Sequence, residues 1–294
     1  MSKVHFEKIA LIGIGLIGGS IALEARKRGL ATSIVAATRS AETAALANRL
    51  KLADHCGTDL AAAVKDADLV IVCTPVGACG PATAAIASSL KPGCIVSDVG
   101  SVKQTVIADM LPHIPKGVHF VPAHPVAGTE NSGPEAALLD LFEGRWTILT
   151  PLPDSDAEAV NRLEAFWKAL GSQVDRVDPA HHDRILAITS HLPHLIAYTI
   201  VGTADDLGGH LNAEVLKYAA GGFRDFTRIA ASDPTMWRDI FVNNKEAVLE
   251  VLQRFQEDLF YLQRAIRWGE GDKLSELFTR TREIRRALIH LNQA

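Results

Sequence analysis

The stretch Lys8-Ile9-Ala10-Leu11-Ile12-Gly13-Ile14-Gly15-Leu16-Ile17-Gly18-Gly19 lies near the start of this 294-residue chain and decides the fold of its first half. The apolar run at 8–13 predicts a strand, and the pattern at 17–28 predicts a helix. Glycines with the spacing GxGxxG join the two: the first permits a sharp turn, the second lets the backbone approach a pyrophosphate, and the third allows close helix–strand packing. The segment predicts a dinucleotide site that contains Gly13, Ile14, Gly15, Leu16, Ile17 and Gly18.

Further strands are expected along the first half of the chain, with a helix at 41–50. The predicted strands are 33–38, 69–74, 94–98, 118–122 and 145–150. Strands that alternate with helices through short connections favour a parallel sheet covered on both faces. The predicted fold of this half is an α/β Rossmann domain with a doubly wound, mostly parallel sheet.

The strand pattern stops near Pro179, which predicts an all-α second half. We therefore place the domain boundary near Asp178-Pro179, giving domains 1–178 and 179–294. The segment 183–204 is predicted to be helical apart from a break at Pro193. Ser232-Asp233-Pro234 reads as a helix start, with a capping side chain followed by proline in the first turn.

Apolar residues recur near the carboxyl end with spacings of three and four. They are Val248, Leu252, Phe255, Leu259, Leu262 and Ile266, and, after a break at 269–271, Leu274, Leu277, Ile284, Leu288 and Leu291. Such a seam must be buried against other helices. It could pack within one chain, but a long helical half has few other surfaces to cover it, so a homodimer is favoured.

The end of the second predicted strand bears on which dinucleotide binds. Sites that prefer NAD usually carry a carboxylate there, whereas this chain has Thr38-Arg39-Ser40. An arginine flanked by two hydroxyl groups suits the 2′-phosphate of NADP, so NADP is predicted to be preferred, with NAD possible. The alternative is a surface arginine and NAD bound by other means. Cys73, Thr74 and Pro75 end the third strand and are predicted to border the nicotinamide, unless the proline only leads into a loop.

Composition restricts the class of protein. Apolar residues make up 48%, charged residues 22%, and the formal net charge is −4, which is ordinary for a soluble protein and does not favour nucleic acid as a partner. The four cysteines form no CxxC pair and are expected to be reduced. The apolar stretch 185–204 is interrupted by polar residues and proline, so it is expected to be a poor membrane span. With no signal peptide visible, a cytoplasmic protein is predicted.

His124 follows the strand-like segment 118–122. Ligands bind at the carboxyl ends of strands in doubly wound sheets. A histidine there can accept a proton from a hydroxyl group while hydride leaves the same carbon. The alternative is a histidine that only caps a loop.

Two polar clusters lie in the helical half, Thr189–His194 and Gly221–Arg228. His191 and His194 are three residues apart without a neighbouring Cys or carboxylate, so no metal site is predicted. An anionic substrate explains the arginines and histidines better, because Arg228 can bind a carboxylate through two hydrogen bonds. The alternative is an ion pair on the helix surface, such as Asp225 with Arg228.

The motifs GIGLIGGS, DVGSVK, HPVAGTE, TSHLPH and GGFRDFTR occur in this order, and together they resemble the prephenate/arogenate (cyclohexadienyl) dehydrogenase family of tyrosine biosynthesis. The resemblance extends over nearly the whole chain. It implies NAD(P)-dependent oxidation of a cyclohexadienyl ring with loss of its carboxylate, and a Rossmann domain followed by an all-α dimerisation domain. Prephenate and arogenate both remain candidate substrates, and tyrosine, if it inhibits, is expected to compete at the active site. Because the chain runs from the first strand to Ala294, a fused chorismate mutase or ACT domain is not expected.

The resemblance also implies roles for individual residues. His124 corresponds to the catalytic histidine and Ser101 to the serine that assists it. The substrate-binding positions are His191, His194, Arg228, Thr129, Glu130, Gly221 and Asp225, and of the two histidines His191 is favoured.

Two other functions fit the sequence less well. A β-hydroxyacid or 6-phosphogluconate type dehydrogenase uses a lysine and a following asparagine on one helix face; the nearest candidate is Lys245, but position 249 is leucine, so the match fails. A non-catalytic NADP-sensing module would need only the first half, and the clustered histidines and arginines of the second half argue against it.

Overall fold

The computed structural model describes residues 4–208 and 218–290. The chain divides into two compact units, Met1–Lys245 and Glu246–Ala294. The first unit contains both sheets and the first helices of the second half, and the described residues of the second are helical apart from one turn. The predicted seam position Leu291 lies outside the described residues.

The first unit begins with alternating strands and helices. Its elements are β1 (Phe6–Ile12), α1 (Leu16–Arg28), β2 (Ala31–Ala37), α2 (Ala41–Arg49), β3 (His55–Gly57), α3 (Leu60–Val64), β4 (Leu69–Val72), η1 (Val76–Ala78), α4 (Cys79–Ile86), η2 (Ala87–Ser89), β5 (Ile95–Asp98), α5 (Gln104–Met110), η3 (Leu111–His113), β6 (His119–Phe120), β7 (Ala123–Pro125), η4 (Pro134–Ala136), β8 (Trp146–Leu149), α6 (Ala157–Ala169) and β9 (Gln173–Arg176).

The remaining described elements are helical. They are α7 (Pro179–Leu186), η5 (Ala187–His191), α8 (Leu192–Gly208), α10 (Gly221–Thr227), η7 (Arg228–Ala231), α11 (Pro234–Asn243), α12 (Lys245–Arg267) and α13 (Gly271–His290). No strand follows Pro179 in the part of the chain that the structure describes, as the sequence predicted. Asp233 caps α11 by accepting hydrogen bonds from the amides of Thr235 and Met236, which confirms that helix start.

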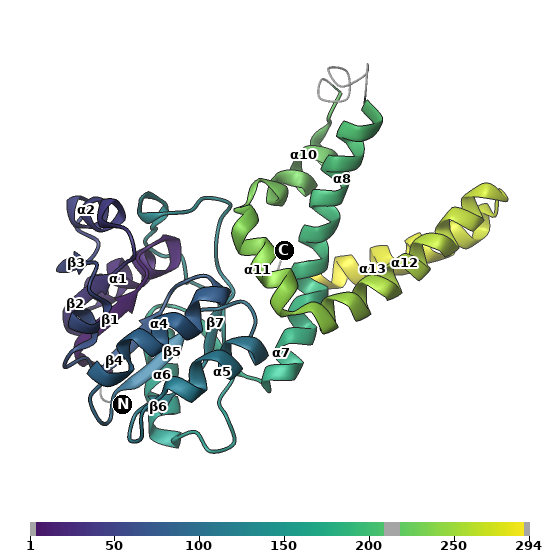
Figure 1. The fold of residues 1–294 in the computed structure, drawn as a ribbon. Helices are drawn as coiled ribbons and strands as arrows, with labels where there is room; N and C mark the ends of the chain where they lie inside the picture. The colour runs from purple at the N-terminus through teal and green to yellow at the C-terminus, as the bar shows by residue number, and fades with distance from the viewer. Residues whose placement is uncertain (1–3, 209–217, 291–294) are drawn as a thin grey trace. The chain divides into compact units, whose positions relative to one another are not determined.

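A six-stranded parallel sheet in the order β3-β2-β1-β4-β5-β6 forms the frame of the first unit (Figure 1). Side chains of β1 alternate between two buried cores: Ile9 and Leu11 pack with α1, α2 and α6, whereas Ala10 and Ile12 pack with α3, α4 and α5. Helices therefore cover both faces. This strand order and layering are those of the Rossmann fold, which confirms the predicted fold class.

His124 lies in a second, smaller sheet, which the sequence did not predict. The predicted strand 118–122 is confirmed but shorter: β6 spans His119–Phe120 and pairs parallel with β5. The chain then forms β7, which pairs antiparallel with β8 and places His124 opposite Ile148. Pro122 separates the two strands, and proline has no amide hydrogen to continue a sheet ladder. β9 completes this sheet by pairing parallel with β8.

The predicted break at Pro193 is also absent, because α7, η5 and α8 form one continuous helical run. Proline within a helix lacks an amide donor and its ring clashes with the carbonyl four residues earlier. Here a π-helical turn at Ala187–His191 immediately precedes it, and such a wider turn accommodates the proline. By length and composition alone, the helix Pro179–Leu207 could cross a membrane, and 22% of its most apolar window is buried within this chain.

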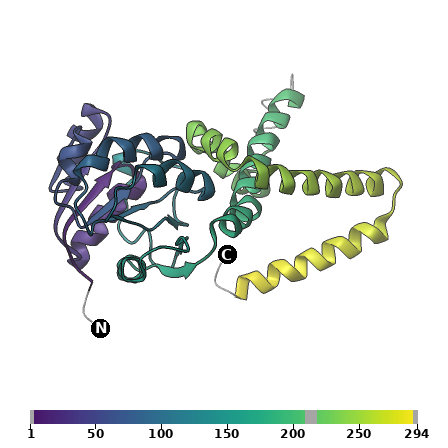
Figure 2. The same cartoon turned by 60° about the horizontal axis from the view of Figure 1, so that its bottom comes forward.

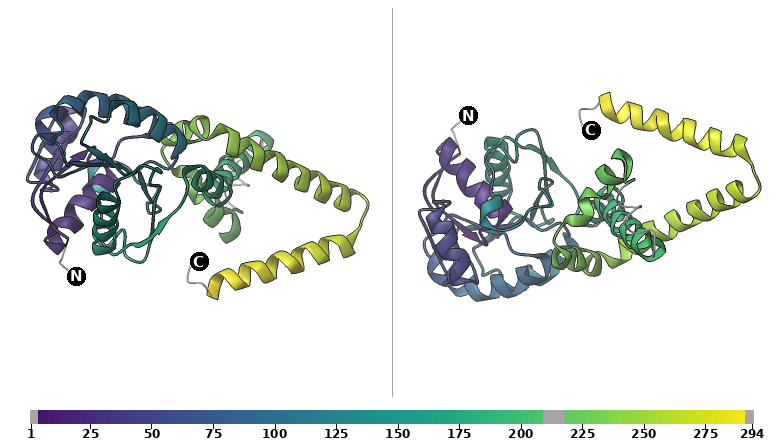
Figure 3. Two further views of the ribbon diagram at one scale, coloured as in Figure 1. Left: turned by 90° about the horizontal axis from the view of Figure 1, so that it is seen from below. Right: turned by 90° about the horizontal axis from the view of Figure 1, so that it is seen from above.

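The second unit contains most of α12 and all of α13. Gly269, with φ of 65°, lies in the turn between the two helices, which confirms the predicted break. The helices diverge from this turn (Figures 2 and 3). As a result, several seam residues are exposed in the single chain, among them Leu259, Ile266 and Ile284.

Candidate active site

The glycine-rich turn has the shape that a dinucleotide phosphate group needs. Gly13 has φ of 102°, and a Cβ there would lie 2.5 Å from the carbonyl oxygen of Cys73. A Cβ on Gly18 would lie 2.2 Å from the carbonyl oxygen of Gly13. At Gly15 the nearest atom to a Cβ is 3.9 Å away, so the backbone is open on that side at the start of α1. The residues therefore fit a pyrophosphate at the helix N-terminus.

The other predicted cofactor residues surround this turn. Thr38, Arg39 and Ser40 follow β2, Arg39 is exposed, and the Ser40 hydroxyl caps α2 by accepting from the amide of Thr43. Cys73 and Thr74 follow β4, next to Gly13. Burial raises the pKa of the Cys73 thiol far above its ordinary value, so this side chain is a neutral wall of the site and no thiolate.

A line of three polar side chains ends at His124. The Nδ1 atom of His124 lies 2.8 Å from the Nε2 atom of His182, and the Nδ1 atom of His182 lies 2.9 Å from the Oδ1 atom of Asp183. All three are buried. Asp183 also accepts hydrogen bonds from the amides of Lys103 and Gln104, at 2.7 Å and 3.0 Å. Helix α7 is thereby fastened to the start of α5 beside His124.

The order of donors in this line follows from Asp183. Amide donors and the His182 ring hold the pKa of Asp183 below its ordinary value against the opposing effect of burial, so it is a carboxylate and accepts from His182 Nδ1–H. A neutral His182 then has a lone pair on Nε2, which accepts from His124 Nδ1–H. The Nε2 atom of His124 is left with its lone pair free. The arrangement therefore makes His124 a proton acceptor.

Both histidines are neutral near pH 7. Burial, followed by the neighbouring His182, Lys103 and His191, holds the pKa of His124 well below its ordinary value. Burial also lowers the pKa of His182, although Asp183 acts in the opposite direction. A base that is already unprotonated at neutral pH needs no activation step.

Asp98 and Lys103 form a fully buried ion pair beneath His124. Asp98 accepts from the amides of Gly100 and Ala123, at 2.7 Å and 3.2 Å, and Lys103 Nζ donates to the carbonyl of Ala123 at 2.7 Å. The ion pair is thus hydrogen-bonded to both the backbone amide and the carbonyl of Ala123, the residue that precedes His124. It also fixes the loop that carries Ser101, so the structure brings the two predicted catalytic segments together.

His191 and His194 lie beside Trp237 of α11. The His194 ring stacks on the indole with centroids 3.6 Å apart, and its Nδ1 atom donates to the carbonyl of Ser190. His191 is fully buried, and its Nδ1 atom lies 3.1 Å from the amide nitrogen of Asn244. Its Nε2 atom has no hydrogen-bond partner among the described residues.

Arg228 and Glu130 form an ion pair of 2.8 Å that joins the loop after β7 to the start of η7. The alternative of an ion pair on the helix surface holds for Arg224, which pairs with Asp225 at 3.3 Å while both are exposed, but not for the example of Asp225 with Arg228. Thr129 caps its own loop by accepting from the amide of Asn131. Gly221 begins α10.

Several residues of this cluster were not predicted as site residues. They are Asp98, Lys103, His182, Asp183, Trp237 and Asn244. Asp98 and Lys103 belong to the DVGSVK motif. Within the described ranges no three metal-binding side chains are grouped to hold an ion.

Two protein-family models match consecutive parts of this chain. The model of the prephenate dehydrogenase nucleotide-binding domain matches residues 21–176, and that of the prephenate dehydrogenase dimerization domain matches residues 178–280. The two matches meet beside the boundary that we predicted, whereas the spatial units divide after Lys245.

Individual relatives agree with this assignment. A cyclohexadienyl dehydrogenase of Zymomonas mobilis is 40% identical over 96% of both chains, and a prephenate dehydrogenase of Bacillus subtilis is 34% identical over 96% of this chain and 76% of its own. A crystal structure of Aquifex aeolicus prephenate dehydrogenase, in complex with hydroxyphenyl propionate and NAD+, aligns with a TM-score of 0.87 at 33% identity, over 96% of this chain and 98% of that one. The hydroxyacid dehydrogenase alternative is not favoured. This chain belongs to the prephenate dehydrogenase family.

Proposed function

We propose that this protein catalyses the oxidative decarboxylation of prephenate, arogenate or both, with hydride transfer to NAD(P), in tyrosine biosynthesis. The observation that carries the proposal is the line Asp183–His182–His124, which presents an unprotonated Nε2 atom in a buried site. The family assignment and the glycine-rich turn supply the substrate class and the cofactor.

The reaction requires one proton acceptor at the ring hydroxyl. His124 Nε2 takes the hydroxyl proton as hydride leaves the same ring carbon, and the nicotinamide supplies the hydride acceptor when it is bound. The carbon–carbon bond to the ring carboxylate breaks, carbon dioxide leaves, and the electron pair of that bond makes the ring aromatic. The phenolate oxygen then recovers the proton from His124. The positive charge that forms on His124 in between is shared with His182 and stabilised by Asp183.

The remaining polar residues bind and orient the substrate. Ser101 lies on the loop that Lys103 ties to Ala123, and we assign it to the same hydroxyl group as His124. Arg228 attracts an anionic group of the substrate, and His191 and His194 line the region beside it. Thr129, Glu130, Gly221 and Asp225 border this region, and Glu130 holds Arg228 by its ion pair. Product tyrosine is proposed to compete for the same groups.

The activity is tested by mixing the protein with NADP+ and, in separate reactions, prephenate, arogenate and a series of short hydroxyacids. Reduced nicotinamide is followed by its absorbance. We expect turnover with prephenate or arogenate and none with the hydroxyacids. Turnover confined to the hydroxyacids would refute the proposal, and the ratio of kcat/KM for the two ring substrates assigns the preferred one.

NADP is proposed as the preferred cofactor, because Arg39 is exposed directly after β2 between Thr38 and Ser40 and no carboxylate stands there. Replacing Arg39 by alanine should raise KM for NADP by about 10–100-fold, since a hydrogen bond to a charged group contributes about 1.5–3 kcal/mol. KM for NAD should stay within about twofold, because NAD lacks the 2′-phosphate. Steady-state kinetics with both cofactors checks this, and a lower KM for NAD than for NADP in the wild type would contradict it.

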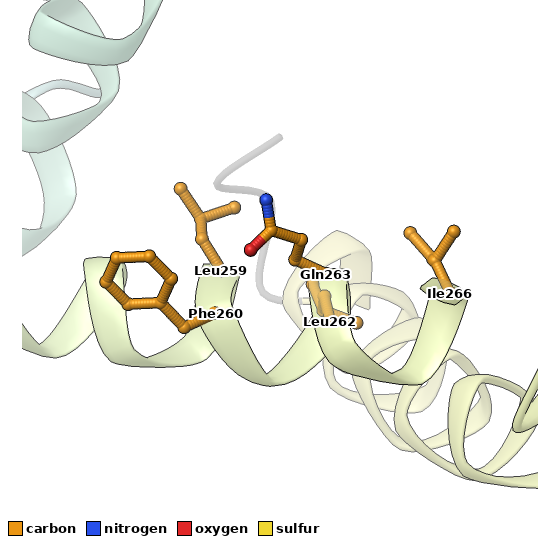
Figure 4. A pocket seen from close by; sticks show the side chains of 5 residues that line it. All are labelled: Leu259, Phe260, Leu262, Gln263 and Ile266. Carbon is orange, nitrogen blue, oxygen red and sulfur yellow. The ribbon is translucent and has the colours of Figure 1, made fainter. Parts of the chain in front are cut away.

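A homodimer is proposed because apolar side chains of the helical half are exposed in the single chain. Leu259, Phe260, Leu262 and Ile266, with Gln263, line a shallow hollow on α12 (Figure 4). The family model that matches this half describes a dimerization domain.

The long apolar helix Pro179–Leu207 also has exposed apolar side chains that a second copy would cover. It carries the buried, hydrogen-bonded His182 and Asp183, which favours a core helix over a membrane span. We therefore propose a cytoplasmic protein.

Replacing Phe260 by aspartate tests the dimer. Its side chain is 69% exposed, so one chain should tolerate the change, but a charge buried between two copies is costly. We expect the wild type to sediment at twice the 31.6 kDa mass of one chain, and the variant to sediment mainly as one chain. Ser88→Asp places the same charge at an exposed position of η2, outside α12, and should remain dimeric. A wild type that sediments as a single chain at micromolar concentration would refute the proposal.

A further inference from the structure

The amide side chain of Asn244 is buried at the end of α11 and faces two acceptors. Its Nδ2 atom lies 2.9 Å from the carbonyl oxygen of Asp183 and 3.1 Å from Nδ1 of His191. The first contact settles which way the amide points, because the opposite orientation would set its oxygen against a carbonyl oxygen. Asn244 therefore donates to both groups.

Because the Asn244 amide donates a hydrogen bond to Nδ1 of His191, only one neutral tautomer of His191 is possible. Nδ1 must carry the lone pair, so the hydrogen is on Nε2. The Nε2–H group is buried and has no partner among the described residues. Orphaned buried donors of this kind are rare in proteins, and an absent ligand explains one.

The charge state of His191 is set by its surroundings. Burial, which is the largest effect, lowers its pKa to about 4, although Asp183 acts in the opposite direction. The titratable groups that face it are His124 of β7, His182 and Asp183 of α7 and His194 of α8. Trp237 and Asn244 of the α11 segment are uncharged. His191 is therefore neutral near pH 7 and has a single donor to offer.

We infer that Asn244 is a positioning residue that holds His191 in its Nε2–H form, so that His191 donates a hydrogen bond to an oxygen of the ring substrate. The inference rests on the proposed function for the identity of that substrate. His191 and His124 are electrostatically coupled neighbours, yet they are set in opposite tautomers. His124 Nε2 accepts a proton and His191 Nε2 donates a hydrogen bond, so the substrate can bind in only one orientation with its hydroxyl group at the base.

The tautomer is measured directly by 15N NMR of the histidine side chains, with the His191 signals assigned by their loss in His191→Gln. The wild type should show hydrogen on Nε2 of His191. The variant Asn244→Asp replaces the donor by a carboxylate, which accepts from Nδ1–H, and should move the hydrogen to Nδ1. This readout needs no substrate, so it tests the tautomer even if the proposed reaction is wrong.

Kinetics tests the substrate contact. At pH 8, KM of Asn244→Asp for the ring substrate should rise about 10–100-fold, since a buried polar group left unpaired costs about 1–3 kcal/mol. A carboxylate beside His191 also raises its pKa, so lowering the pH should protonate the ring, restore Nε2–H and bring KM back toward the wild-type value. The wild type, with its pKa about 4, should show no such recovery above pH 6.

Matched variants separate this effect from a loss of folding. Asn243→Asp places the same charge at the neighbouring position, where the side chain bonds only its own helix at Asp239, and KM should stay within about twofold. His191→Gln should bind the substrate more tightly than His191→Leu, because an amide can accept from Asn244 and still donate. The inference would be overturned by hydrogen on Nδ1 of His191 in the wild type, or by equal KM values for the His191→Gln and His191→Leu variants. If the wild type turns over neither ring substrate, only the proposed function is overturned.

Discussion

Replacing His124 by alanine is expected to lower kcat by about 10²–10⁴-fold, the range over which a positioned general base acts. His124 is the end of the hydrogen-bonded line from Asp183, and its Nε2 atom is the free acceptor of that line. Both ring nitrogens of His182 already have partners, His124 and Asp183, so His182 offers no free acceptor in its place. The dissociation constant of NADP should change by less than about twofold, because the proposed cofactor contacts are at the glycine-rich turn and Arg39 rather than at His124.

The measurement is a steady-state rate with the ring substrate together with a cofactor titration by fluorescence. His181→Ala is the matched control: this histidine is adjacent to His182 along α7, but its side chain is exposed and should be dispensable. A His124→Ala enzyme whose kcat lies within about tenfold of the wild type would remove His124 from the role of base.

Replacing Lys103 by methionine is expected to destabilise the protein by about 3–5 kcal/mol, because the change leaves the buried Asp98 carboxylate without its cation. Lys103 and Asp98 are both fully buried. The loss includes the hydrogen bond from Lys103 to the carbonyl of Ala123, so the strand that carries His124 also loses its support. Urea unfolding followed by tryptophan fluorescence checks the change in the free energy of unfolding.

The double variant Asp98→Asn with Lys103→Met separates charge from packing. It removes both charges and keeps side chains of similar size. The double variant should therefore be more stable than Lys103→Met alone, because no unpaired charge remains buried. Lys168→Met is a surface control, because its ion pair with Glu164 is exposed and should contribute at most about 1 kcal/mol. A Lys103→Met protein as stable as this control would show that the pair does not hold the site together.

The sequence predicted the parts of the site that depend on local pattern. Gly13 and Gly18 have the close contacts that their spacing within one turn implied. The alternation of strands and helices and the helix cap at Asp233 also follow from short segments whose pattern is visible in the sequence. His124 was found because a histidine before proline after an apolar run is conspicuous.

The partners of His124 and His191 could not be found in this way. His182 is 58 residues from His124, and Asn244 is 53 residues from His191. Such contacts depend on how helices pack, which a single sequence does not reveal. Strand β7 was missed for the same reason, because it pairs with a later strand. At Pro193 the local effect of proline predicted a break, but the wider π-helical turn before it accommodates the proline within a continuous helix.

The most direct test of the central claim measures carbon dioxide and reduced nicotinamide in the same reaction with prephenate and NADP+, and again with arogenate. The account predicts that at least one ring substrate yields the two products in equal amounts and that His124→Ala yields neither at an appreciable rate. Reduced nicotinamide without carbon dioxide, or no reduction with either substrate, would contradict it.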